Sequence, residues 1–214
     1  GTPPGFDYGV TAYVTAPRLV WITDYKFLGG YYGADVLVPY AYVDQDDSYG
    51  VMKNKSGIGD IFFEPATLSW HQQQWDFGVG YGFWAPTGNY DDDPTEPSLI
   101  WKGYWSHMLT AGATYYLDTN KTVSVSILNR YEIPHENDDV GITPGHAYTL
   151  EWGISKAVTK TVEVGVAGYW QQQVTKDADS SNDVLDRIIG VGPEVNLFCP
   201  KVGLFTSLRY LVEF

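Results

Sequence analysis

The 214-residue chain is poor in cysteine, in charged and especially basic residues, and in long apolar runs, and each shortage argues against a class of protein. One cysteine, Cys199, excludes a disulfide framework and any metal site built from several cysteines. Charged residues make up 18% of the chain, which is low for a soluble globular domain. Only 13 of them are Lys or Arg against 26 Asp or Glu, and a net charge of −13 argues against a nucleic-acid partner. No apolar run approaches the ~20 residues of a spanning helix.

Aromatic residues and glycine are plentiful instead. The chain contains 17 Tyr, 8 Trp and 23 Gly, while its hydrophobic content of 44% is unremarkable. Membrane β-barrels combine an apolar outer face with a polar interior, so their mean hydropathy resembles that of soluble proteins although aromatics run high. The composition therefore favours a membrane β-barrel.

Residues 56–91 contain the clearest structural pattern, two apolar runs at 59–71 and 75–87 around a short polar turn at 72–74. In the second run, bulky residues alternate with a face that is mostly glycine (Gly78, Gly80 and Gly82), which predicts a β-hairpin. Twelve residues at about 3.3 Å, tilted by about 45°, rise roughly 28 Å, close to the thickness of the hydrocarbon core of a bilayer. If the hairpin forms part of a barrel, the glycine face predicts a stretch of the barrel wall without side chains. The N-terminal segment of the chain or a solute could lie along it.

The same alternation extends along the chain and predicts an all-β, antiparallel transmembrane barrel as a single domain over residues 1–214. Ten strands are expected, at 10–23 with an irregularity at Pro17, 31–44, 59–71, 75–87, 104–118, 122–133, 146–156, 161–174, 186–198 and 203–214. The expected turns are short near 73, 120, 160 and 201 and somewhat longer at 24–30, whereas polar loops at 45–56, 89–103, 135–145 and 176–185 are long. Short periplasmic turns and long extracellular loops are typical of outer-membrane barrels.

Several segments together resemble the outer-membrane channel family of the "MetA-pathway of phenol degradation". The matching segments are SGIGDIFFEPATLSWH (56–71), WDFGVGYGFWAPTGNYD (75–91), HMLTAGATYYLD (107–118), LEWGISK (150–156), YWQQQVT (169–175) and PKVGLFTSLRYLVEF (200–214). The resemblance implies a monomeric twelve-stranded barrel for uptake of small hydrophobic molecules, with two more strands expected, one between PPGF and Tyr8 and one beyond Phe214. It also implies that the arm at residues 1–6, with Pro3, Pro4 and Phe6, enters the lumen.

Charged strand residues are expected to face the lumen, because a charge that faces lipid at the middle of the bilayer costs up to a few kcal/mol in barrels. The predicted channel-lining charges are Arg18, Asp35, Asp60, Glu64, Asp76, Arg130, Glu132, Glu151, Glu163, Glu194 and Arg209. The predicted lumen aromatics are Phe62, Trp84, Tyr116, Tyr169 and Phe198. The charges could set the electric field of a constriction, or Arg–Glu pairs could simply brace the wall.

Outward-facing aromatics are interpreted as interfacial girdles, with the core of a soluble β-sandwich as the alternative. The residues are Trp105, Trp152, Trp170, Tyr40 and Tyr210. Cys199, at the end of a strand, is expected to pack against apolar groups.

Catalytic and metal-binding candidates are few. His135 or His146 near Asp138 and Asp139 could serve an enzyme at the outer rim, a hypothesis that no further motif supports. The acidic run at 91–93 could bind Ca²⁺, although its spacing favours a solvated loop. We therefore expect no cofactor and no metal.

The predicted function is passive uptake of small hydrophobic or aromatic molecules across the outer membrane of a Gram-negative bacterium, by a monomer that is not an enzyme. Its expected partners are membrane lipid, lipopolysaccharide or detergent, and the solute itself. An outer-membrane barrel enzyme of lipase or protease type and a soluble ligand-binding barrel are the alternatives.

Overall fold

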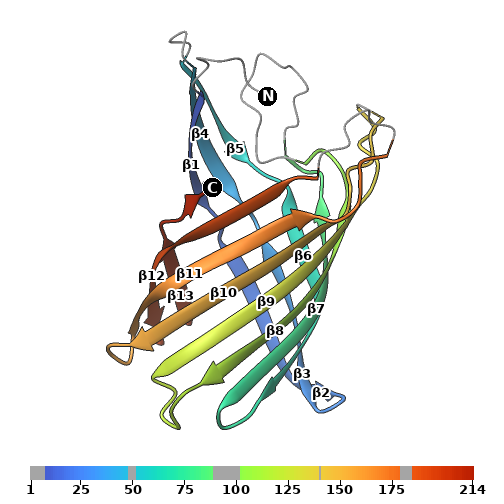
Figure 1. Cartoon of the computed structure of the whole chain (residues 1–214). Coiled ribbons are helices and arrows are strands. Elements are labelled where there is room, and N and C mark those ends of the chain that lie inside the picture. The colour runs from blue at the N-terminus through green and yellow to red at the C-terminus, as the bar shows by residue number, and fades with distance from the viewer. Residues whose placement is uncertain (1–7, 48–51, 89–101, 140, 179–184) are drawn as a thin grey trace.

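The computed structural model describes residues 8–47, 52–88, 102–139, 141–178 and 185–214, which form an all-β antiparallel fold (Figure 1). No helix long and apolar enough to cross a membrane occurs within these ranges. The predicted lumen arm with Pro3, Pro4 and Phe6, and the acidic run at 91–93, lie outside the described residues.

The strands within the described ranges form ten antiparallel spans, the number that the alternation predicts. The strand bounds are β1 Tyr8–Thr15, β2 Arg18–Phe27, β3 Gly30–Leu37, β4 Tyr40–Asp47, β5 Met52–Ile58, β6 Ile61–His71, β7 Trp75–Ala85, β8 Ser106–Tyr116, β9 Val123–Pro134, β10 Ala147–Ala157, β11 Val162–Gln173, β12 Arg187–Cys199, β13 Leu204–Arg209 and β14 Val212–Glu213. One sheet has the order β13-β12-β11-β10-β9-β8-β7-β6-β3-β2, β14 pairs with β12, and a smaller sheet has the order β1-β4-β5. Among the described strands, β2 and β13 are the edges of the larger sheet, and the twelve strands implied by the resemblance stay a prediction.

The smaller sheet continues three spans of the larger one across a shared bend. β1 passes into β2 at Pro17, β3 into β4 at Pro39, and β5 into β6 at Gly59. Pairing persists through the bend, because Val38 N donates to Pro17 O at 3.0 Å and Gly59 N donates to Pro39 O at 2.8 Å. Proline has no N–H, so these positions contribute only carbonyl acceptors to the ladder. The irregularity expected at Pro17 is therefore one part of a three-strand bend.

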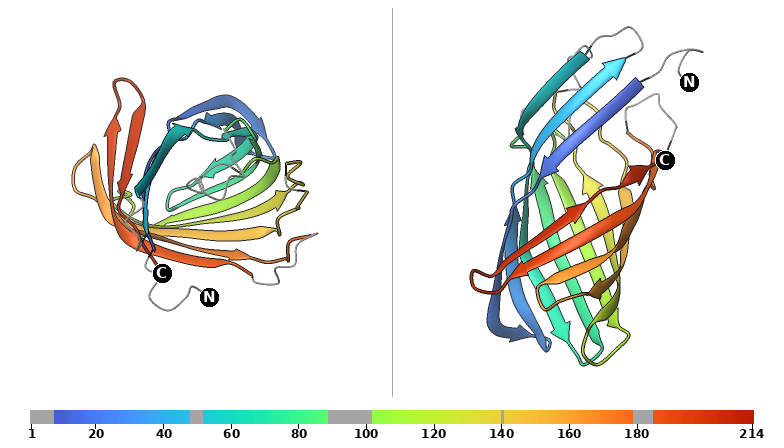
Figure 2. Two further views of the ribbon diagram at one scale, coloured as in Figure 1. Left: turned by 90° about the horizontal axis from the view of Figure 1, so that it is seen from above. Right: turned by 90° about the vertical axis from the view of Figure 1, so that its left-hand side faces the viewer.

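The predicted loop at 45–56 is wrong. β4 extends to Asp47 and β5 begins at Met52, with Asp46 paired to Met52 and Tyr40 to Ile58. The segment is polar on both faces, so it lacks the alternation that marks a half-buried strand. The smaller sheet stands above the rest of the wall, at the end that carries the long connections (Figures 1 and 2).

The connections are short at one end, as predicted, and the hairpins β2–β3, β6–β7, β8–β9, β10–β11 and β12–β13 all turn there (Figure 1). The β8–β9 turn is ordered by Asp118, whose carboxylate accepts the N–H groups of Val123 (2.9 Å) and Thr122 (2.8 Å). These hydrogen bonds stabilise the charged carboxylate and lower the pKa of Asp118 below its ordinary value.

Seen from above, the larger sheet curls around a central space (Figure 2). Bulky apolar residues lie exposed on the outer face, among them Val79, Leu109 and Ile127. Of the predicted girdle residues, Trp105, Trp170, Tyr40 and Tyr210 are exposed, while Trp152 lies against Gly168. An apolar exterior of this kind suits lipid and would leave a soluble barrel with a large unpartnered surface.

Cys199 is exposed rather than packed, which corrects the expectation for it, because β12 ends there and a tight turn follows.

Candidate functional site: a charged belt on the inner face

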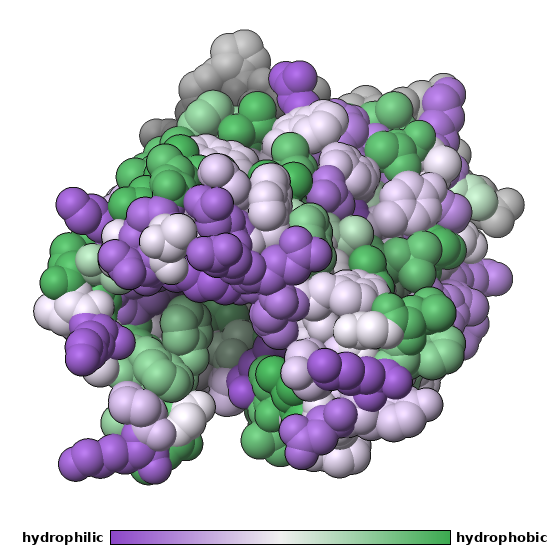
Figure 3. Space-filling view, turned by 90° about the horizontal axis from the view of Figure 1, so that it is seen from below, coloured by the Kyte–Doolittle hydropathy of each residue, from purple (hydrophilic) through white to green (hydrophobic). Residues whose placement is uncertain are grey.

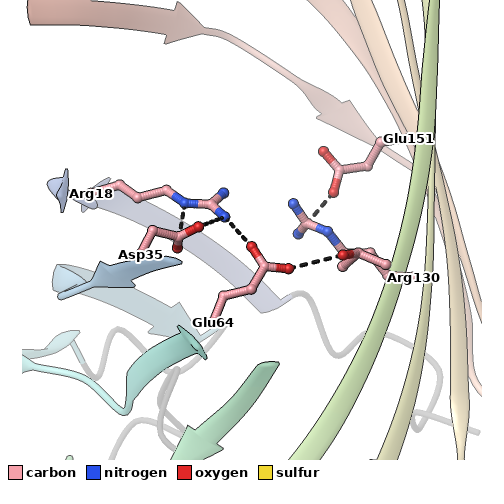
Figure 4. Close-up of polar contacts among 6 residues, drawn as sticks. Arg18, Asp35, Glu64, Arg130 and Glu151 are labelled. Atoms are coloured by element: carbon pink, nitrogen blue, oxygen red, sulfur yellow. Dashed lines mark hydrogen bonds and ion pairs between the residues drawn. The ribbon is translucent and has the colours of Figure 1, made fainter. Parts of the chain in front are cut away.

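Three charged side chains from β2, β3 and β6 meet on the inner face. The guanidinium of Arg18 donates two 2.7 Å hydrogen bonds to Asp35 and one of 2.6 Å to Glu64 (Figure 4). The carboxylate side chains of Asp35 and Glu64 are only 4% and 5% exposed. Two nearly buried carboxylates thus depend on one guanidinium for their neutralisation.

A second charged group lies on β9, β10, β12 and β13. Arg130 contacts Glu151 at 2.9 Å, Arg209 lies 3.7 Å from the other oxygen of Glu151, and Arg209 also donates to Glu194. Glu194 accepts a further bond from Asn196 at 2.8 Å. Cations and carboxylates therefore alternate along this series of contacts, which runs from Arg130 through Glu151 and Arg209 to Glu194.

Thr110 connects the two groups. Its hydroxyl donates to Glu64 at 2.9 Å, and it is paired in register with Arg130 on the neighbouring strand. We call the whole set the charged belt; it comprises Arg18, Asp35, Glu64, Thr110, Arg130, Glu151, Glu194 and Arg209.

Glu64 reaches Thr110 because of a bulge and a glycine. Asp35 is opposite Glu64, and the register of β6 against β7 shifts between Phe63 and Ala66. The Glu64 carboxylate then lies across Gly80, where a Cβ would collide with Glu64 and with Thr110. The ring of Phe62 covers Gly82 in the same way. The hypothesis of a wall without side chains is therefore wrong at Gly80 and Gly82, because neighbouring side chains lie over them.

We expect Gly80→Ala to destabilise the protein by about 1–3 kcal/mol, because the added methyl forces Glu64 away from Thr110. Gly78→Ala is the matched control on the same strand, since the nearest atom to its Cβ would be Leu68 O at 3.8 Å, an ordinary contact. Urea unfolding in detergent micelles measures both variants. Equal unfolding free energies for the two would contradict the assigned role of Gly80.

At the end with the long connections, Asp60 and Glu132 accept hydrogen bonds around Lys102. The two oxygens of Asp60 accept the backbone N–H groups of Gly88 (2.9 Å) and Lys102 (2.6 Å). The Lys102 ammonium contacts Glu132, to which Ser106 also donates at 2.5 Å. These two carboxylates thus hold the chain on both sides of the 89–101 segment in place.

At the end with the short turns, Asp76 accepts a 2.7 Å hydrogen bond from Tyr116 and lies 3.2 Å from Lys121 and 3.1 Å from His71. Glu163 is held differently, by the amide of Asn196 at 3.2 Å. Among the described residues, no cation is paired with Glu163.

The predicted lumen aromatics fall into three situations. The rings of Phe62 and Trp84 contact each other, with centroids 4.9 Å apart, and Lys102 lies over Trp84. Tyr116 and Tyr169 donate to carboxylates, Asp76 and Glu213 respectively. Phe198, paired with Phe205 across the last hairpin, does not line the cavities described below.

Two cavities lie along the inner face. The larger, about 430 Å³, has small, apolar and aromatic residues in its wall, among them Leu128 and Trp152. Its charged lining residues are Asp76, Glu151, Glu163, Glu194 and Arg209. The second, about 310 Å³, lies at the other end and includes Lys102 and Glu132. Seen from the end with the short turns, the surface is hollowed between lobes of mixed hydropathy (Figure 3).

The histidines proposed for catalysis lie among aromatic rings. His107 accepts or donates a 2.7 Å hydrogen bond with Tyr81, and its ring centroid lies 4.9 Å from that of His135. His146 pairs with Tyr131 at 2.9 Å. Within the described ranges, no group of three potential metal ligands occurs.

Every predicted charged residue contacts a partner that is polar or of opposite charge. The prediction did not single out Lys102, Thr110 or Asn196, which complete these contacts. Asn196 lies two residues from Glu194, and Thr110 lies six residues from Tyr116, so alternation puts each on the face of a predicted inward residue. Nothing in the sequence directs Lys102 to Glu132.

Comparison with known proteins gives a family and a fold. A family model described as "Putative MetA-pathway of phenol degradation" matches residues 2–214. Among solved structures, the chain is similar to the COG4313 outer membrane channel from Pseudomonas putida F1, with a TM-score of 0.75 and 18% identity. The alignment covers 90% of this chain and 73% of that one. No curated protein matches.

Proposed function

This chain belongs to the MetA-pathway of phenol degradation family, and we propose that it is an outer-membrane channel for the passive uptake of small hydrophobic or aromatic molecules. The observation that carries the proposal is the inner face, where two cavities lie along a wall of mixed small, polar and aromatic side chains. Such a lining can admit a small amphipathic solute without binding it tightly, which conduction requires.

The apolar outer face and the fold of the solved channel support a location in the outer membrane of a Gram-negative bacterium. The short turns then face the periplasm and the smaller sheet faces the outside of the cell. We propose that the protein acts as a monomer and without catalysis. His107 and His146 pair with tyrosines, and the ring of His135 lies against that of His107. His71 pairs with Asp76, so no described histidine ring is hydrogen-bonded to a serine, threonine or cysteine.

The test is transport in a defined membrane. Protein purified in detergent and inserted into planar bilayers should give discrete single-channel currents, and proteoliposomes should take up small aromatic compounds faster than protein-free vesicles. Uptake that rises with solute concentration up to the solubility limit, and that requires no energy source, supports passive flux. Properly folded protein that gives neither current nor solute flux would overturn the channel proposal while leaving the fold intact.

A further inference from the structure

Two histidines from neighbouring strands come together on the outer face. His107 lies near the start of β8, and His135 directly follows the last residue of β9. The β8–β9 ladder continues beyond these bounds, because His135 N donates to Trp105 O at 2.8 Å. His135 is therefore diagonal to His107, on the face that carries the exposed Trp105. The centroids of the two imidazole rings lie 4.9 Å apart, with an angle of 58° between the ring planes.

The distance between the rings of His107 and His135 is the one that a shared metal ion requires. With metal–nitrogen bonds of about 2.0–2.1 Å and tetrahedral angles, two imidazole rings on one ion have centroids about 5 Å apart. The same distance also fits an ordinary contact between two rings. The ring nitrogens therefore decide between the two interpretations.

A hydrogen bond with Tyr81 leaves one nitrogen of His107 for a ligand. Tyr81 Oη lies 2.7 Å from His107 Nδ1, so Nε2 is the nitrogen that can bind a metal. Metal-binding histidines usually have their other ring nitrogen held by a hydrogen bond, which fixes the tautomer and the orientation of the ring. His135 is exposed, and its ring makes no hydrogen bond to any other described residue. Both imidazoles thus have a nitrogen available.

The surroundings of the two rings favour a cation. Glu136, Asp138 and Asp139 follow His135 and are exposed, and their negative charges raise the local concentration of cations. Imidazole nitrogen suits Cu²⁺, Zn²⁺ and Ni²⁺, whereas Mg²⁺ and Ca²⁺ prefer oxygen ligands. Two protein ligands leave the other coordination positions to water. By the general order of divalent affinities, Cu²⁺ should bind more tightly than Ni²⁺ or Zn²⁺.

We propose that His107 and His135 form a binding site for a divalent transition-metal ion on the outer face, at the end with the long connections. The ion joins the start of β8 to the residue at which the β9–β10 connection begins. The site lies apart from the inner face and is independent of the proposed channel function. It departs from the expectation of no metal, because strand register brings together two histidines that are far apart in the sequence.

The test is a titration with Cu²⁺ of the detergent-solubilised protein, without an affinity tag and in a buffer that does not bind metals. Calorimetry measures the dissociation constant, and the electron paramagnetic resonance spectrum of the bound Cu²⁺ reports its nitrogen ligands. The unaltered protein should bind one Cu²⁺ most tightly, through two imidazole nitrogens. His107→Gln and His135→Gln should each weaken this binding by more than tenfold, since loss of a mere second-shell partner already costs about 10–100-fold.

The double variant should bind Cu²⁺ no more weakly than either single variant, because one imidazole alone cannot chelate the ion. Tyr81→Phe removes only the hydrogen bond to His107 Nδ1 and should weaken binding by about tenfold. If His107→Gln fails to fold, the exposed His135→Gln still tests the site.

His146→Gln is the matched control. His146 Nδ1 lies 2.9 Å from the hydroxyl of Tyr131, a contact like that of His107, but no second histidine ring lies beside it among the described residues. Its affinity for Cu²⁺ should equal that of the unaltered protein. Unchanged affinity in folded His135→Gln, equal weakening by His146→Gln, or a spectrum with oxygen ligands alone would overturn the site.

Discussion

Replacing Arg18 with methionine is expected to destabilise the protein by about 1–3 kcal/mol, because two nearly buried carboxylates lose their hydrogen-bond donor although the Arg18 side chain is itself 37% exposed. Asp35 and Glu64 would then face each other nearly buried, with no cation between them. The free energy of unfolding in urea, in detergent micelles, measures the loss. The expected cost is large because two carboxylates, not one, lose their neutralising partner.

A charge-free triad separates charge from packing. Arg18→Met combined with Asp35→Asn and Glu64→Gln should recover most of the lost free energy, because no unpaired charge is left. Lys160→Met, in an exposed short turn, is the matched control and should change stability by no more than about 0.5 kcal/mol. A triple variant as unstable as Arg18→Met would mean that the Arg18 side chain acts through packing rather than through its charge.

The second large effect is expected from Glu163→Lys, which should shift the ion selectivity of the channel toward anions. Glu163 lines the larger cavity and is held by the neutral Asn196 amide, so no paired cation cancels its field. A unit charge at 4 Å contributes about 1 kcal/mol in water, so each unit of charge changed alters the local ion concentration by roughly fivefold. The reversal potential across a KCl gradient measures this change.

Glu136→Lys provides the same change of charge on an exposed residue outside the strands, and its reversal potential should stay near that of the unaltered protein. Raising the salt concentration should reduce the effect of Glu163→Lys, because mobile ions screen the added charge. Equal reversal potentials for the two variants at low salt would show that the larger cavity is not on the ion path.

The membrane-spanning part of the fold could be predicted from sequence because lipid on one side and polar groups on the other impose strict alternation. All ten spans follow from that pattern, and so do the short turns at one end. The same logic failed at β5, because the residues at 52–58 are mostly polar and alternate no differently from a loop. The bend at Pro39 was not predicted, because the alternation of residues 31–44 continues through it.

The candidate site could be predicted only as a set of inward residues. Which of them meet depends on cross-strand register and on the bulge between Phe63 and Ala66, neither of which is visible in a single sequence. Gly80 illustrates the difference, because a glycine alone suggests an empty stretch of wall, whereas the Glu64 carboxylate from the adjacent strand β6 fills the space. Lys102 comes from a connection, where no periodicity constrains direction.

The three-strand bend has a mechanical consequence. Because ladder hydrogen bonds cross it at Pro17 and Pro39, none of the three strands can pivot alone without breaking bonds to its neighbour. We therefore expect the smaller sheet to move as one unit about the three-strand bend. A force on any one strand of the smaller sheet would be shared by the other two strands. That force would reach the larger sheet next to the pair Arg18 and Leu37, where the charged belt begins.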